Sequence, residues 1–163
     1  MPLSDKMTHD ELFLWASRGN RDASDFLKLI TEAFHVWDDL IDKDKPVSDG
    51  DINRAFMTAF VALPENKFYM GNITHIHPII CNAITNWMAA NEMEQGICSD
   101  DDLHIAFIIR SEYINLVIET ARICGGHLWA TEIAGEVRRV AHEEGYKAYR
   151  ENLITEKKIR NGE

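Results

Sequence analysis

The sequence predicts an all-α protein, a single-domain bundle of five to seven helices. Apolar residues recur at helical spacing, and helix-capping residues and helix-ending glycines and prolines separate the apolar segments. No window alternates apolar and polar residues between hairpin turns, as a half-buried strand does. The chain has 163 residues, 45% of them apolar, which suffices for one hydrophobic core. No linker or repeat divides it, so one domain over residues 1–163 is expected.

The first two helices are expected on either side of Gly19-Asn20. Thr8 and Glu11 have the spacing of a capping box, which predicts a short helix that ends at the glycine. A second helix is expected from about residue 22 to about residue 43, because Pro46 follows closely and cannot continue a helix.

The third and fourth helices are predicted from caps and prolines. Ser48 can cap a third helix through the apolar run 55–63, which Pro64 ends. Residues 65–77 are expected to form a loop. Pro78 suits the first turn of a fourth helix that reaches about residue 94.

A fifth helix, from about residue 100 to about residue 124, is predicted to be the central buried one. Ser99 precedes it, and three aspartates occupy its first turn, where the helix dipole favours negative charge. Its apolar side chains cover well over half of its circumference, which is typical of a helix enclosed by others. A sixth helix is expected after Gly125-Gly126, from about residue 128 to about residue 144, with a frayed, charged tail from about residue 156.

The polar residues of the fifth helix form a narrow strip. Ser111, Asn115 and Glu119 repeat at intervals of four and share one face, with Arg122 beside them. On a buried helix, such a strip faces solvent or lines a polar cavity. Arg110 instead projects into the apolar arc, where an unpaired charge would cost several kcal/mol. It is therefore expected to have a carboxylate partner or to extend its guanidinium to an edge.

Charge and cysteine usage restrict the partners and the compartment. The formal charge of −10 has the wrong sign for binding nucleic acid or an anionic membrane. The first ten residues lack the apolar core of a signal peptide, and no apolar run reaches the about 18 residues of a membrane helix. Cys81, Cys98 and Cys124 form no C-x-x-C pair and are expected to be free, buried thiols. These features predict a cytoplasmic protein.

An acidic segment at the end of the second helix carries the clearest functional pattern. Asp38 and Asp42 lie one helical turn apart, so their carboxylates can share a divalent cation, with Asp39 behind them. Oxygen ligands of this kind favour Mg²⁺, which usually completes its shell with water and substrate phosphates. Carboxylates near a helix C-terminus also oppose the helix dipole, and such an unfavourable placement indicates a functional role.

This segment, Asp38-Asp39-Leu40-Ile41-Asp42, resembles the D-D-x-x-D helix of the all-α class I isoprenoid (terpenoid) synthase superfamily. The resemblance implies a Mg²⁺ cluster that holds a prenyl diphosphate. The family's second metal motif has Asn or Asp, Ser or Thr, and Glu at intervals of four. Ser111, Asn115 and Glu119 have this interval, with the first two residue types exchanged. Members are usually about twice as long as this chain.

The predicted function is Mg²⁺-dependent binding, and possible turnover, of a small molecule bearing a diphosphate. Asp38, Asp42 and Asp39 are the predicted metal residues, and Asn115 and Glu119 would hold a further ion or water. Three residues are predicted to contact the substrate: Arg110, Arg122 and Ser111.

The alternative is a non-catalytic helical module that forms a homodimer and whose acidic face is solvated. It rests on helical spacing, which places Asp39 and Asp42 opposite the apolar face of their helix. Another metal pattern is incomplete, because Glu32-x-x-His35 has the spacing used by di-iron bundles but no second Glu-x-x-His follows.

Overall fold

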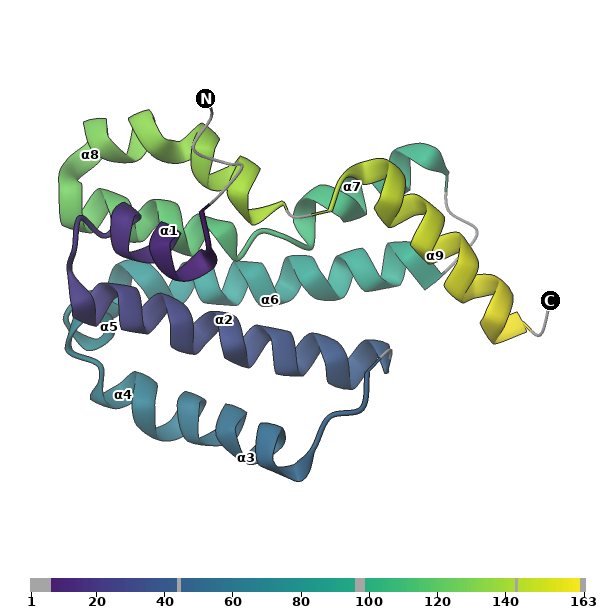
Figure 1. Ribbon diagram of the computed structural model, residues 1–163, viewed down its shortest axis with the longest axis horizontal. Coiled ribbons are helices and arrows are strands. Elements are labelled where there is room, and N and C mark those ends of the chain that lie inside the picture. Colours follow the sequence, from purple (N-terminus) through teal and green to yellow (C-terminus); the bar gives the residue numbers. More distant parts are fainter. Residues whose placement is uncertain (1–6, 44, 96–98, 143, 162–163) are drawn as a thin grey trace.

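A computed structural model describes residues 7–43, 45–95, 99–142 and 144–161 of the chain (Figure 1). Every regular element in these ranges is a helix, which confirms the all-α bundle. The helices are α1 (His9–Ala16), α2 (Arg21–Asp42), α3 (Asp49–Met57), the π-helical segment η2 (Thr58–Ala62), α4 (Leu63–Glu65), α5 (Lys67–Gly71), α6 (Ile73–Gln95), α7 (Asp100–Ile109), α8 (Ile114–Ala141) and α9 (Tyr146–Asn161).

The helix starts follow the local sequence. Thr8, Ser48 and Ser99 each form a complete capping box, in which the hydroxyl accepts the third backbone N–H and the acidic residue at that position accepts the cap's own N–H. Asn20 caps α2 by accepting the N–H of Ala23 at 3.1 Å. These caps satisfy backbone donors that a helix terminus leaves free, so they fix where each of the four helices begins.

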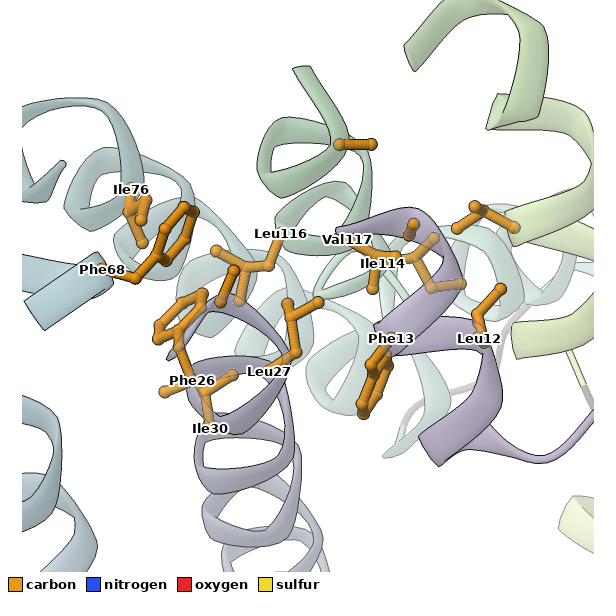
Figure 2. Close-up of a cluster of buried hydrophobic side chains, with 14 of the residues drawn as sticks. Leu12, Phe13, Phe26, Leu27, Ile30, Phe68, Ile76, Ile114, Leu116 and Val117 are labelled. Atoms are coloured by element: carbon orange, nitrogen blue, oxygen red, sulfur yellow. The ribbon is translucent and has the colours of Figure 1, made fainter. Parts of the chain in front are cut away.

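The hydrophobic core lies where the N-terminal half of α2 meets α1, α5 and α8, as Figure 2 shows. Phe26 is fully buried, and its ring lies 5.6 Å from that of Tyr69 and 5.9 Å from that of Phe68. Other buried members come from α1, α2, α6 and α8: Leu12, Phe13, Leu27, Ile30, Ile76, Ile114, Leu116 and Val117. The C-terminal half of α2 is less covered, and there the helix borders a cavity.

The segment 65–77 is helical, so its prediction as a loop is wrong. Asn66 caps α5, and α6 begins at Ile73, which places Pro78 inside the helix rather than in its first turn. Phe68 and Ile76 are buried in the hydrophobic core, and the ring of Phe68 lies 5.9 Å from that of Phe26 on α2. Burial of these apolar side chains outweighs the turn-forming tendency of the glycine, asparagine and proline in the segment.

The predicted central helix 100–124 is two helices. After α7 the chain passes through tight turns at residues 110–113, where the N–H of Ser111 bonds the carbonyl of Ile108 at 3.3 Å. The part from Ile114 onward belongs to the main hydrophobic core, whereas the buried residues of α7 are Leu103 and Ala106. α7 lies at the periphery, with Ile105 and Ile108 about half exposed. The amphipathic pattern continued across the break, which is why the sequence suggested one helix.

A sharp bend at Gly126 divides α8 into two arms, as the predicted end at Gly125-Gly126 implies. Its φ of 85° and ψ of 173° are non-helical, although both flanking segments are helical. The first arm packs in the core, and the second returns above α1 (Figure 1). The indole N–H of Trp129, just after the bend, donates to the carbonyl of Ala16 at 3.0 Å and so ties the second arm to α1.

Replacing Gly126 by alanine is expected to destabilise the protein by about 1–3 kcal/mol, because this backbone conformation is essentially restricted to glycine. Gly50→Ala is the matched control, since Gly50 lies in helix α3 with ordinary space for a Cβ atom. That variant should be neutral or slightly stabilising. Urea unfolding of both variants measures the difference, and equal stabilities would contradict the role assigned to the bend.

The C-terminal helix α9 continues to Asn161, where the sequence suggested a frayed tail from about residue 156. It packs against α7, at the end of the molecule where α6 also ends (Figure 1). Cys81 is exposed rather than buried, Cys124 is half-buried, and both are free thiols; Cys98 lies outside the described residues. Across the described ranges, no helix has the length and apolarity needed to cross a membrane.

Candidate functional site

A cavity of about 920 Å³ lies where several parts of the chain meet. The C-terminal halves of α2 and α6, the turn at residues 110–113 and α9 supply most of its lining. α7, α1 and the end of α8 contribute further residues, which are Phe107, His9, Ala141 and His142. Asp42 and Gln95, the last residues of α2 and α6, both line the cavity. Helix C-termini carry partial negative charge, so the backbone itself makes this cavity attractive to cations.

Arg110 is the centre of the site. Its Nη1 atom bonds Glu94 Oε1 at 2.6 Å, and its Nη2 atom lies 3.3 Å from Asp38 Oδ1 and 3.4 Å from Asp42 Oδ2. The expectation that Arg110 has a carboxylate partner is therefore confirmed, and it has three. These contacts join α2, α6 and the turn before α8.

The site carries excess negative charge. Three carboxylates contact one guanidinium, which leaves a net charge of −2 when all four groups are ionised. Burial lowers the pKa of Arg110, but the carboxylates, Glu94 first, outweigh this and raise the pKa above its ordinary value. Arg110 is therefore permanently charged, and the remaining charge favours a further cation.

Tyr149 connects α9 to this cluster. Its hydroxyl donates to Glu94 Oε1 at 2.5 Å, and the guanidinium of Arg110 lies 5.8 Å from the centre of its ring. Burial, together with the hydrogen bond and the charge of Glu94, raises the pKa of Tyr149 above its ordinary value. Tyr149 therefore stays protonated and remains a donor, which holds Glu94 in position against Arg110.

Two tryptophans form the aromatic part of the wall. The indole N–H of Trp87 donates to Asp38 Oδ1 at 2.7 Å, and the Trp87 ring lies 4.1 Å from that of Trp37. Both residues line the cavity. The hydrogen bond fixes the direction of the Asp38 carboxylate, because one of its oxygens accepts from both Trp87 and Arg110.

The structure brings together four of the predicted site residues and places the other four elsewhere. Asp38, Asp42, Arg110 and Ser111 all line the cavity. Asp39 is absent from the cavity lining and lies 3.8 Å from the ammonium of Lys45. The remaining three lie along the first arm of α8: Asn115, Glu119 and Arg122.

Those three residues belong to a different environment. Asn115 accepts a hydrogen bond from Arg138 at 2.9 Å and donates to Glu112, while Glu119 forms an ion pair with Arg122. Asn115 and Glu119 line a second cavity, of about 580 Å³, beside α6. The polar strip thus lines a cavity, as its pattern suggested, but not the cavity that contains Asp38. The break at residues 110–113 separates Ser111 from the other two.

The predicted site residues did not include several that line the cavity, among them Trp87, Asn91, Glu94 and Tyr149. Glu94 and Asn91 are buried on α6. A signal for both existed, because polar residues at positions 91 and 94 continue the helical spacing of the buried Ala83 and Ala90. A buried carboxylate on such a stripe requires a cation. Tyr149 gave no comparable signal, since its contact depends on how α9 folds back.

As it stands, the part of the chain that the structure describes contains no group of three or more His, Cys, Asp or Glu side chains arranged to hold a metal ion. The guanidinium of Arg110 contacts three of the five carboxylates that line the cavity, those of Asp38, Asp42 and Glu94, and neutralises part of their charge. A second cation at Asp38 and Asp42 would compete with Nη2 for these two carboxylates.

Searches against protein-family models, curated proteins and solved structures found no match to this chain. The arrangement of the cavity is therefore the basis for a functional proposal.

Proposed function

We propose that this protein binds a small diphosphate-bearing molecule through Mg²⁺ in the cavity between α2, α6 and α9. The observation that carries the proposal is the convergence of Asp38, Asp42, Arg110 and Ser111 on one cavity. Asp38 and Arg110 are 72 positions apart in the chain, so their meeting is a property of the fold. Carboxylate oxygens suit Mg²⁺, and a guanidinium and a hydroxyl suit phosphate oxygens. From the resemblance to isoprenoid synthases, this proposal takes the binding of a diphosphate through Mg²⁺ and leaves the organic part of the ligand open.

The contacts of Arg110 are compatible with cation exchange. The bond from Nη1 to Glu94 is short, at 2.6 Å, whereas the two contacts of Nη2 are long, at 3.3 and 3.4 Å. Long charged contacts are weaker than those of 2.7–2.9 Å. Mg²⁺ can therefore displace Nη2 from Asp38 and Asp42 while Glu94 and Tyr149 keep the side chain in place. Nη2 then becomes available to a phosphate oxygen.

The bound ion would neutralise the leaving or attacked phosphate group as a Lewis acid. Among the residues of the chain, Asp38 and Asp42 supply ligands, Ser111 supplies a hydroxyl donor, and Arg110 supplies positive charge. The proposal includes turnover of the diphosphate-bearing molecule, because this arrangement places a metal ion and positive charge at the phosphate. Binding of the molecule is the first step of such a reaction.

We expect millimolar Mg²⁺ with 1 mM pyrophosphate to raise the melting temperature of the wild-type protein. A ligand at about 100 times its Kd stabilises by about 2.7 kcal/mol. For a chain of this size, this corresponds to a shift of about 5–10 °C. The shift should vanish in Asp38→Asn and in Asp42→Asn, as measured by differential scanning fluorimetry.

Asp39→Asn is the matched control, because it removes a neighbouring carboxylate of the same helix that is absent from the cavity lining. It should retain the full shift. A wild-type protein that melts at the same temperature with and without Mg²⁺ and pyrophosphate would refute the proposal. An equal loss in Asp39→Asn would show that overall charge, rather than the site, is responsible.

The second candidate function is a non-catalytic helical module that forms a homodimer. It is favoured by apolar side chains exposed on α3 and η2, where Phe56 is 62% and Phe60 is 73% exposed and their rings lie 5.9 Å apart. Sedimentation equilibrium tests it. The dimer hypothesis requires a dimeric wild type and a monomeric Phe60→Glu variant, and a monomeric wild type rejects it.

A further inference from the structure

The residues that line the cavity indicate which organic group the ligand carries beside its diphosphate. This inference rests on the proposed function. A prenyl chain requires a continuous apolar wall. Here the aliphatic lining residues are Ala83, Ala141 and Leu153. The other lining residues are aromatic or polar, and the polar ones occur on every wall. Such a wall suits a planar ring that carries hydrogen-bonding atoms, because aromatic faces stack on it and polar groups recognise its edge.

Asn91 supplies an unsatisfied polar group at this wall. It is 9% exposed and lines the cavity, and its Oδ1 atom accepts no hydrogen bond. A buried acceptor without a donor is costly, so native proteins rarely leave one. Oδ1 itself is buried, and a rotation about the broad terminal torsion of asparagine would exchange it with Nδ2 and present it to the cavity. In that orientation Oδ1 would be available to accept an N–H group of a ligand.

The aromatic wall lies next to Asn91. Trp87 and Asn91 are one helical turn apart on α6, so their side chains share a face. Trp87 is also hydrogen-bonded to Asp38, and it contacts Trp37. The indole of Trp87 thus connects Asp38, a proposed metal ligand, to the position where the ring of the ligand would stack.

We infer that the organic part of the ligand is a planar nitrogen heterocycle, and that the ligand class is the nucleoside diphosphates rather than the prenyl diphosphates. The ring stacks on Trp37 or Trp87 and donates an N–H to Asn91 Oδ1, while the diphosphate binds with Mg²⁺ at Asp38 and Asp42. The cavity volume of about 920 Å³ lies within the range of sites for small organic ligands.

Isothermal titration calorimetry in 5 mM Mg²⁺ tests this with ADP, UDP, geranyl diphosphate and pyrophosphate as probes. At least one nucleoside diphosphate should bind about tenfold or more tightly than pyrophosphate and geranyl diphosphate. In Asn91→Leu this advantage should fall below about threefold, while pyrophosphate affinity is unchanged. Asn82→Leu, which alters an exposed amide of the same helix that lines the second cavity, should retain the advantage.

Trp37→Leu provides a second route if Asn91→Leu fails to fold, and it too should remove most of the advantage over pyrophosphate. The inference is overturned if geranyl diphosphate binds as tightly as the nucleoside diphosphates, or if the advantage survives in both variants. If pyrophosphate binds and no nucleoside diphosphate binds more tightly than it does, the ligand class is rejected and the proposed function still stands. Nucleotide binding that needs neither Mg²⁺ nor Asp38 would reject the metal site instead.

Discussion

Arg110→Met is expected to destabilise the protein by about 3–5 kcal/mol, because it removes the guanidinium that contacts the carboxylates of Asp38, Asp42 and Glu94. Methionine keeps the volume of the aliphatic stem, so the loss comes mainly from the charge. Mg²⁺ should restore part of the lost stability, since the ion supplies the missing positive charge. Urea unfolding at neutral pH, with and without Mg²⁺, measures both effects.

Arg122→Met is the matched control for this variant. Arg122 forms an ion pair with Glu119 on the same helix, and its side chain is 41% exposed. Exposed pairs of this kind contribute at most about 1 kcal/mol. The control should therefore change stability little and show no added response to Mg²⁺. A similar loss in both variants would contradict the central role given to Arg110.

Phe26→Ala is expected to cost about 3–5 kcal/mol, the range for removing a fully buried aromatic side chain. Phe26 joins α2 to Phe68 and Tyr69 of α5, so its loss should weaken the docking of both helices. Native domains are stable by about 5–15 kcal/mol, and the variant would lose a large part of this. Chemical unfolding at low temperature gives the difference.

Phe60→Ala removes the same atoms from a side chain that is 73% exposed, and its stability should change by less than about 0.5 kcal/mol. Phe26 and Asp38 are 12 positions apart on one helix, which corresponds to about 18 Å. Folded Phe26→Ala protein should therefore retain the Mg²⁺ response. Equal effects of the two phenylalanine substitutions would contradict the position of the core.

The elements that local signals determine were predicted well. Thr8, Ser48 and Ser99 begin their helices because each has an acidic residue three positions later, an interaction within a single turn. The bend at Gly126 was likewise visible as a pair of glycines. These features need no knowledge of distant parts of the chain.

Errors arose where tertiary contacts decide the structure. Residues 65–77 contain turn-forming residues, yet they are helical because Phe68 and Ile76 are buried in the hydrophobic core. Residues 100–124 have a continuous helical pattern, yet the chain turns after Ile109, and Arg110 there contacts α2 and α6. Neither result follows from spacing within the segment itself.

The candidate site was predicted only in part, again because tertiary contacts decide which residues meet there. Asp38 and Asp42 were identified from their spacing, and Arg110 from its unfavourable position on an apolar arc. Glu94 and Tyr149 complete the cluster, but their positions depend on how α6 and α9 pack around it. A charge in an apolar pattern thus indicates that a partner exists, and the fold determines which residue it is.

Paramagnetic broadening by Mn²⁺ tests the central claim most directly, because Mn²⁺ accepts the same oxygen ligands as Mg²⁺. The four tryptophans serve as internal probes through their indole N–H signals. Trp87 donates to Asp38 and contacts Trp37, whereas Trp15 and Trp129 pack together at the α1–α8 contact.

Substoichiometric Mn²⁺ should broaden the Trp87 and Trp37 signals and leave those of Trp15 and Trp129 sharp, and excess Mg²⁺ should reverse the effect. In the variant with both Asp38→Asn and Asp42→Asn, no selective broadening is expected. Equal broadening of all four signals, or selective broadening that persists in the double variant, would contradict a metal site at these two aspartates.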